Sequence, residues 1–303
     1  MNQTSKLLPC SGMRLRNPAL AIMLLCALFA FFLILTPIVT SLMSRTGIRY
    51  EALVRLGMII QDLFVFILPA MITAILSTKL PARLLGVDSI PSGKITALAV
   101  ITLFCSMPAM NLIVEWNDGM HLPESMVALE TQMRAMEDAA QQTIDTLMAG
   151  AGVGSLLVSV LIIGVLAGFS EELFFRGGLL RTVMCTRING HAAVWLVALI
   201  FSVLHFQFYG FIPRMLLGAF FGYVLWWSGS LWLPVFLHVL NNSIVVYMTW
   251  RKANAPSEAI EGIEKIGTNM GSGADICLVC LSVTVTAWLF WQMWRSRRQQ
   301  VCV

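Results

Sequence analysis

An all-α bundle of about eight transmembrane helices is the fold class that this sequence predicts. The chain has 303 residues, of which 58% are hydrophobic and only 12% are charged, against about 25% charged residues in a soluble domain. Such a composition indicates one polytopic membrane domain and not two soluble ones. The net charge of +4 fits loop charges that set membrane orientation, and it does not indicate a nucleic-acid partner.

Eight apolar stretches are long enough to cross about 30 Å of hydrocarbon at about 1.5 Å per helical residue. We expect spans at residues 18–40, 57–78, 95–114, 153–175, 191–209, 212–228, 231–250 and 275–294. The first follows basic residues but has no small-residue cleavage site within reach. It is therefore predicted to be a retained span, with a signal anchor as the alternative.

Loop charges predict that both termini are cytoplasmic. With eight spans, eleven lysines and arginines and one acid fall on the side of the termini, and eight basic and twelve acidic residues fall on the other side. Lysine and arginine concentrate in cytoplasmic loops, so the terminal side is expected to be inside.

Two segments lie outside the predicted spans. Pro123 to Leu147 is predicted to be an extracytoplasmic amphipathic helix, because its apolar residues recur at helical spacing at 126, 129, 133, 136, 140, 144 and 147. Packing on the membrane or the bundle is favoured over use as a lid. Residues 251–274, rich in Gly, Ser, Ala and Glu, are expected to form an exposed, mobile loop.

A small set of polar side chains falls inside the apolar spans. An ionisable group in hydrocarbon costs about 2.5–3.5 kcal/mol on insertion scales, so its default interpretation is functional. The set is Asp62, Glu171, Glu172, Arg176, His205, His238 and Asn242. Asp62, near the start of its span, is interpreted as an interfacial or packing residue. Gly218 and Gly222 are interpreted as a small-residue contact between helices.

The two adjacent glutamates are predicted to have different roles. Glu172 and Arg176 are four residues apart on one helical face, with the acid first, which is the better order for an ion pair. Glu171 lies about 100° around the helix from Glu172 and can point elsewhere. One carboxylate is thus expected to hold the helix and the other to be left for chemistry.

Glu171, His205, His238 and Asn242 are predicted to converge in depth. If the fourth helix continues to about Met184, Glu171 lies about 20 Å from the cytoplasmic loop, and His205 lies about 22 Å from it. His238 and Asn242, four residues apart, lie about 12 and 18 Å deep. If the helix instead breaks at its Gly-Gly pair, the glutamates lie nearer the cytoplasm.

This set of side chains suits attack by water on a carbonyl. The carboxylate would act as general base with one histidine, and the other histidine and the amide would stabilise the oxyanion. The alternative is a divalent metal such as zinc, with Glu171, His205 and His238 as its ligands. No H-E-x-x-H pattern is present, so the residues leave both alternatives open.

Three motifs in this order resemble the CAAX protease and bacteriocin-processing (Abi) family of intramembrane proteases, which is related to the type II CAAX prenyl endopeptidase. The motifs are E-E-x-x-x-R, F-x-x-x-H and H-x-x-x-N, each beside an apolar span. The matching residues are Glu171, Glu172, Arg176, Phe201, His205, His238 and Asn242. The resemblance covers about residues 150–250.

The resemblance implies a role for each of these residues. Glu171 and His205 would activate water, and His238 and Asn242 would stabilise the oxyanion. Glu172, Arg176 and Phe201 would support the site. The family is often described as metal-dependent, and the resemblance leaves a metal requirement open.

The resemblance also implies a domain organisation and a function. Residues 1–150 would hold the N-terminal spans and the amphipathic helix, 151–250 the catalytic core, and 251–303 a loop and the last span. The expected function is cleavage of a membrane-associated peptide or protein by an integral protein of the bacterial cytoplasmic membrane. The alternative is a non-catalytic immunity, scaffold or partner-binding protein of the same fold.

Overall fold

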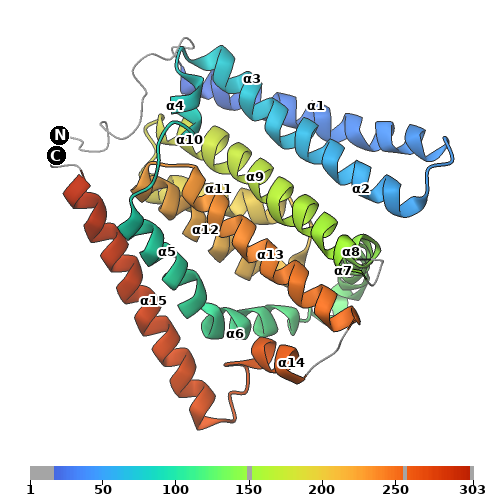
Figure 1. The fold of residues 1–303 in the computed structure, drawn as a ribbon, viewed down its shortest axis with the longest axis vertical. Coiled ribbons are helices and arrows are strands. Elements are labelled where there is room, and N and C mark those ends of the chain that lie inside the picture. The colour runs from blue at the N-terminus through green and yellow to red at the C-terminus, as the bar shows by residue number, and fades with distance from the viewer. Residues whose placement is uncertain (1–16, 149–151, 255–257, 301–303) are drawn as a thin grey trace.

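The computed structural model describes residues 17–148, 152–254 and 258–300, and the regular elements of these residues are helices (Figure 1). Six of the described helices are long and apolar enough to cross a membrane, and a bent helix pair makes a seventh. The predicted fold class, an all-α membrane bundle of about eight helices, is confirmed, and the chain is an integral membrane protein.

The first two spans lie side by side at one edge of the bundle (Figure 1). Helix α1 (Pro18–Ser44) begins with a proline after Asn17, whose side chain accepts a hydrogen bond from the Ala19 N–H. The second span consists of α2 (Tyr50–Gln61), a π-helical segment η2 (Asp62–Ile67) and α3 (Leu68–Ser77). The short helix α4 (Pro81–Leu85) follows.

The third predicted span, 95–114, is a bent pair in the structure. Helix α5 (Gly93–Cys105) and helix α6 (Met107–Asp118) meet at an angle of 47°. Pro108 lies in the first turn of α6; because proline lacks the N–H that would continue the hydrogen-bond ladder, it accounts for the bend. After the 3₁₀ turn η3 (Glu124–Met126), α7 (Val127–Leu147) confirms the helix predicted within 123–147.

The span that carries the adjacent glutamates is continuous from Val153 to Met184. It consists of α8 (Val153–Ser159), η4 (Val160–Leu166), α9 (Ala167–Glu172), η5 (Leu173–Leu180) and α10 (Arg181–Met184). The segments η4 and η5 are π-helical. The helix therefore continues through Gly177 and Gly178 and does not break there. This continuity is needed for Glu171 to lie at the predicted depth in the membrane.

The fifth predicted span, 191–209, is shorter than expected. Helix α11 (Gly190–Val203) has 14 residues and ends in a turn in which Phe206 has a left-handed φ of 54°. A left-handed residue cannot continue a right-handed helix. A 3₁₀ turn η6 (Phe208–Gly210) then leads into α12 (Phe211–Ser228), and α13 (Trp232–Asn254) follows.

Residues 251–274, predicted to be an exposed, mobile loop, are helical in part. Helix α13 continues to Asn254, and α14 (Glu258–Lys265) lies within the predicted loop; residues 255–257 are outside the described part. The amide of Asn111 in α6 donates to the carbonyls of Ile263 (3.1 Å) and Ile266 (3.2 Å). These bonds satisfy backbone groups that an isolated short helix would leave exposed. The last span is α15 (Gly273–Gln300).

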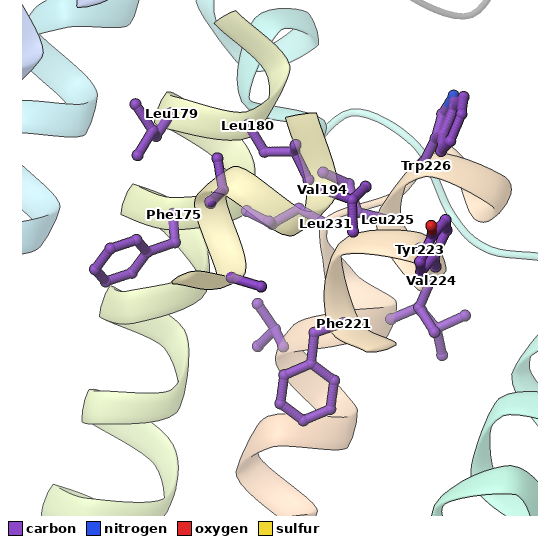
Figure 2. Packing of buried hydrophobic residues seen from close by; sticks show 14 of the residues in the cluster. Phe175, Leu179, Leu180, Val194, Phe221, Tyr223, Val224, Leu225, Trp226 and Leu231 are labelled. Atoms are coloured by element: carbon purple, nitrogen blue, oxygen red, sulfur yellow. The ribbon is translucent and has the colours of Figure 1, made fainter. Parts of the chain in front are cut away.

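The spans with intramembrane polar residues occupy the middle of the bundle. Helices α1 to α3 flank them on one side and α5, α6 and α15 on the other (Figure 1). Figure 2 shows side chains of η5, α11 and α12 packed together there. Lipid is as apolar as leucine, so this contact stabilises the bundle through close packing and not through removal from water.

Gly218 and Gly222 lie where α12 meets α11, as predicted. A Cβ atom at Gly218 would lie 3.1 Å from the Phe201 ring, and one at Gly222 would lie 3.0 Å from the side chain of Val194. The small residues let the two helices approach closely.

Candidate active site

Glu171 and Glu172 lie in α9, between the π-helical segments η4 and η5. Such segments occur often at functional sites. Since successive helical residues point about 100° apart, the two carboxylates diverge. The Glu172 side chain is 0% exposed and the Glu171 side chain is 16% exposed.

Glu172 is the centre of a buried polar group. Its Oε1 lies 2.8 Å from a terminal guanidinium nitrogen of Arg176 and 2.8 Å from Nδ1 of His238. The other terminal nitrogen of Arg176 donates to the carbonyl of Gly218 (3.0 Å), and the guanidinium stacks on the Phe201 ring at 4.6 Å. These contacts link the Glu172 helix to α11, α12 and α13.

His238 lies between the two glutamates. Its Nδ1 contacts Glu172, and its Nε2 lies 3.8 Å from Oε2 of Glu171. Because an ionised carboxylate can only accept, Nδ1 carries a hydrogen. The Phe221 ring packs against the imidazole with centroids 5.2 Å apart. The ring is thus held so that Nε2 points toward Glu171.

His205 follows the last turn of α11 and has a defined tautomer. Its Nδ1 lies 2.7 Å from the carbonyl oxygen of Phe201. A carbonyl only accepts, so Nδ1 donates, and Nε2 of the neutral ring is left as an acceptor. The Phe201 ring contacts both His205 (4.9 Å between centroids) and His238 (6.2 Å).

Asn242 lies one turn beyond His238 on α13. Its Nδ2 donates to the carbonyl of Ile163 in η4 (3.2 Å), and its Oδ1 accepts from Asn241 (3.4 Å). A side-chain amide has two N–H donors, so the contact with Ile163 uses one of them.

Two glycines let α13 approach the glutamate helix. A Cβ atom at Gly164 would lie 2.6 Å from Oγ of Ser243, and one at Gly168 would lie 3.2 Å from the backbone nitrogen of Val239. The helices therefore meet almost backbone to backbone, which brings the α13 side chains within reach of the glutamates.

A cavity of about 490 Å³ joins these groups. Its lining includes Glu171, Phe201, His205, His238 and Asn242. Most of the remaining lining is apolar and comes from α5, α6, α12 and α13. Glu172 and Arg176 do not line it. The structure thus brings the four predicted catalytic residues to one cavity. The predicted ion pair of Glu172 and Arg176 forms, and it is buried outside the cavity lining.

Sequence reasoning missed two charged residues of the cavity. Arg214 and Glu264 both line it, but Arg214 is only the third residue of the predicted span 212–228, and Glu264 lies in the predicted loop 251–274. Arg214 lies in the apolar run FIPRMLL. A sixth span that begins at Phe208, as in the structure, would have placed Arg214 among the charged residues inside the spans. Glu264 belongs to α14, whose position over the cavity depends on tertiary contacts.

Asp62 is a buried residue that contacts the glutamate helix. Its Oδ1 accepts a hydrogen bond from Ser170 Oγ at 2.9 Å, and its residue exposure is 3%. It does not line the cavity. Of the two interpretations offered for Asp62, the structure fits packing and not an interfacial position.

The residues do not form a ready metal site. In the described part of the chain, no three His, Cys, Asp or Glu side chains gather as ligands of one ion. Glu171 and His238 are neighbours, but His205 does not complete a ligand set with them.

A known family model matches the segment of the chain that contains the cavity residues Glu171, His205, His238 and Asn242. The family model described as Type II CAAX prenyl endopeptidase Rce1-like matches residues 153–244, a segment that contains all seven motif residues. No curated protein and no solved structure matches the chain. The family match supports a CAAX-type intramembrane protease in general, and it confirms the family resemblance of the sequence over residues 153–244.

Proposed function

We propose that this chain is an intramembrane endopeptidase that hydrolyses a peptide bond in a membrane-associated peptide or protein. The observation that carries the proposal is the shared cavity: Glu171 of α9, His205 after α11, and His238 and Asn242 of α13 line one space. The family match over residues 153–244 supports the same reaction class.

Glu171 is the proposed general base. Its carboxylate lines the cavity and, unlike Glu172, is not held by Arg176. It removes a proton from a water molecule while the water oxygen attacks the peptide carbonyl carbon. His205 accepts the second water hydrogen at Nε2, because its Nδ1–H is committed to the Phe201 carbonyl. Two acceptors fix the water in position.

His238 and Asn242 are the proposed oxyanion donors. This role requires a hydrogen on each ring nitrogen of His238, so that Nδ1 donates to Glu172 and Nε2 donates to the oxyanion. Asn242 adds its second Nδ2–H. The proton held by Glu171 then passes to the leaving nitrogen as the C–N bond breaks. Removal of one such donor typically lowers kcat by about 10²–10³-fold.

The test is hydrolysis by the purified full chain in proteoliposomes. Apolar peptides that carry a fluorophore and a quencher at opposite ends serve as probes. We expect cleavage by the wild type and a loss of at least about 10²-fold in the Glu171→Gln variant, since glutamine keeps the shape but is not a base.

Glu51→Gln is the matched control, because Glu51 is exposed at the start of α2 and should keep full activity. Equal cleavage by wild type and Glu171→Gln, with both proteins folded, would contradict the proposal. It would favour the non-catalytic alternative of a partner-binding membrane protein.

A further inference from the structure

Arg214 is a cation in the cavity that the proposed reaction does not use. It lies in the first turn of α12 and lines the same space as Glu171 and His205. Among the described residues of the lining, Arg214 is the only lysine or arginine, and Glu171 and Glu264 are the acids. A guanidinium in a largely apolar cavity of a membrane bundle points to an anionic partner.

The known contacts of Arg214 are with neutral acceptors. One terminal nitrogen donates to Oε1 of Gln207 (2.8 Å) and the other to the Gln207 carbonyl (3.4 Å). In the described part of the chain, no carboxylate lies within 4.0 Å of its guanidinium. Of its five N–H donors, some therefore remain for a ligand.

The surrounding turn holds Arg214 in place. The Asn117 side chain accepts from the N–H of Ile212 (2.8 Å) and donates to the carbonyl of Phe208 (3.0 Å), so it clamps the segment that enters α12. Gln207 is itself held by Glu137 of α7 at 3.2 Å. A site fixed before binding loses less entropy when its ligand arrives.

We propose that Arg214 is a subsite for a carboxylate of the bound peptide, so that the preferred substrates are apolar peptides with a carboxylate near the cleaved bond. This inference rests on the proposed function. The guanidinium fork matches a carboxylate with two parallel hydrogen bonds. It also offsets the repulsion that Glu171 and Glu264 would exert on an acidic peptide.

Peptide binding to the Glu171→Gln variant tests this subsite without cleavage. The probes are fluorescent peptides of mixed Ala, Leu, Val and Phe, made as free acids, as C-terminal amides, and as amides with one internal Glu. We expect the forms with a carboxylate to bind at least about tenfold tighter than the plain amide, since hydrogen bonds between charged groups are strong. The better of the two acidic forms identifies the carboxylate as terminal or side-chain.

The preference should disappear in the Glu171→Gln, Arg214→Gln double variant and persist in part with Arg214→Lys. Arg49→Gln, at an exposed arginine before α2, is the matched control and should retain the preference. Equal binding of all three peptide forms, or a preference that survives Arg214→Gln, would overturn the subsite.

The two proposals can fail separately. A carboxylate preference without cleavage by the wild type would keep the subsite and reject the protease. Cleavage without any carboxylate preference would keep the protease and reject the subsite.

Discussion

The adjacent glutamates show how neighbouring residues acquire different chemistry. Glu172 is fully buried, and its carboxylate is paired with Arg176 and contacts Nδ1 of His238. Glu171 lines the cavity; among the described residues no lysine or arginine lies within 4.0 Å of its carboxylate, and Nε2 of His238 lies 3.8 Å away. A buried charge needs partners, whereas a general base needs access to the reacting water. The helical angle between consecutive residues separates the two requirements.

Loss of Arg176 is expected to unfold the bundle more easily. Arg176→Met leaves the buried Glu172 carboxylate short of its main cation, and breaking a buried pair costs about 3–5 kcal/mol. The measurement is unfolding in mixed micelles with increasing SDS, with exposed Arg49→Met as the control.

A second variant separates charge from packing. If Glu172→Leu accompanies Arg176→Met, no uncompensated carboxylate remains, and stability should recover in part because apolar replacements of a buried pair are often tolerated. Wild-type stability of the single variant would show that the pair does not hold the helices.

At the scale of elements, the site depends on the close approach of α9 and α13. A Cβ atom at Gly168 would lie 3.2 Å from both the side chain and the backbone nitrogen of Val239 in α13, so a larger residue must push the helix itself. A displacement of about 1 Å in an active site can reduce the rate by about 10²-fold. Gly168→Val is therefore expected to lower kcat by about that factor in a folded protein.

Gly154→Val is the matched control for the glycine contact. Gly154 belongs to the same span, but nothing lies within 4 Å of a Cβ atom there. The measurement is peptide cleavage with far-UV circular dichroism on both variants. Full activity of Gly168→Val would show that the helix contact does not position the site.

Apolar length and helical period predicted most of the spans, because these properties act within one segment. They did not predict that α11 ends at Val203, since the left-handed Phe206 follows no residue pattern that favours that conformation. The π-helical segments beside the glutamates were also not predicted, because no residue pattern in them distinguishes a π-helix from an α-helix. Helix α14 was not predicted, because the carbonyls at its end are bonded by the side chain of Asn111 in α6, a residue far away in the sequence.

At the scale of the molecule, the spacing of the motifs predicted that Glu171, His205, His238 and Asn242 would meet. It did not predict that His238 also contacts Glu172, because that contact depends on how closely α13 approaches. Nor did it assign Arg214 to the cavity, whose walls come from several spans. Local sequence pattern thus predicted which polar residues line the cavity, and packing determined which partners they contact. The cytoplasmic location of both termini stays a prediction.

Docking of α7 on the rest of the molecule is expected to depend on pH. Hydrogen bonds from the Leu122 N–H, His121 and Arg134 lower the pKa of Glu130 from 4.5 to about 2. Arg134 in turn stacks on the Tyr209 ring at 4.1 Å. The stabilisation is complete above the unfolded-state pKa and is lost as pH falls from about 4.5 toward 2.

Limited proteolysis of the 120–148 segment between pH 7 and pH 3 tests this. The wild type should resist cleavage better than Glu130→Gln at neutral pH, and the difference should shrink as the pH falls below about 4.5. The advantage should be small, since such contacts are near solvent and are screened by salt. A difference that grows in acid would have the wrong sign.

The most direct test of the account is a double-mutant cycle between Glu171 and His205 on kcat/KM for one peptide that the wild type cleaves. Residues that activate the same water act as a unit, and their losses are not additive. We therefore predict that Glu171→Gln with His205→Ala is about as slow as the worse single variant. A double variant whose loss equals the product of the two single losses would contradict a shared water.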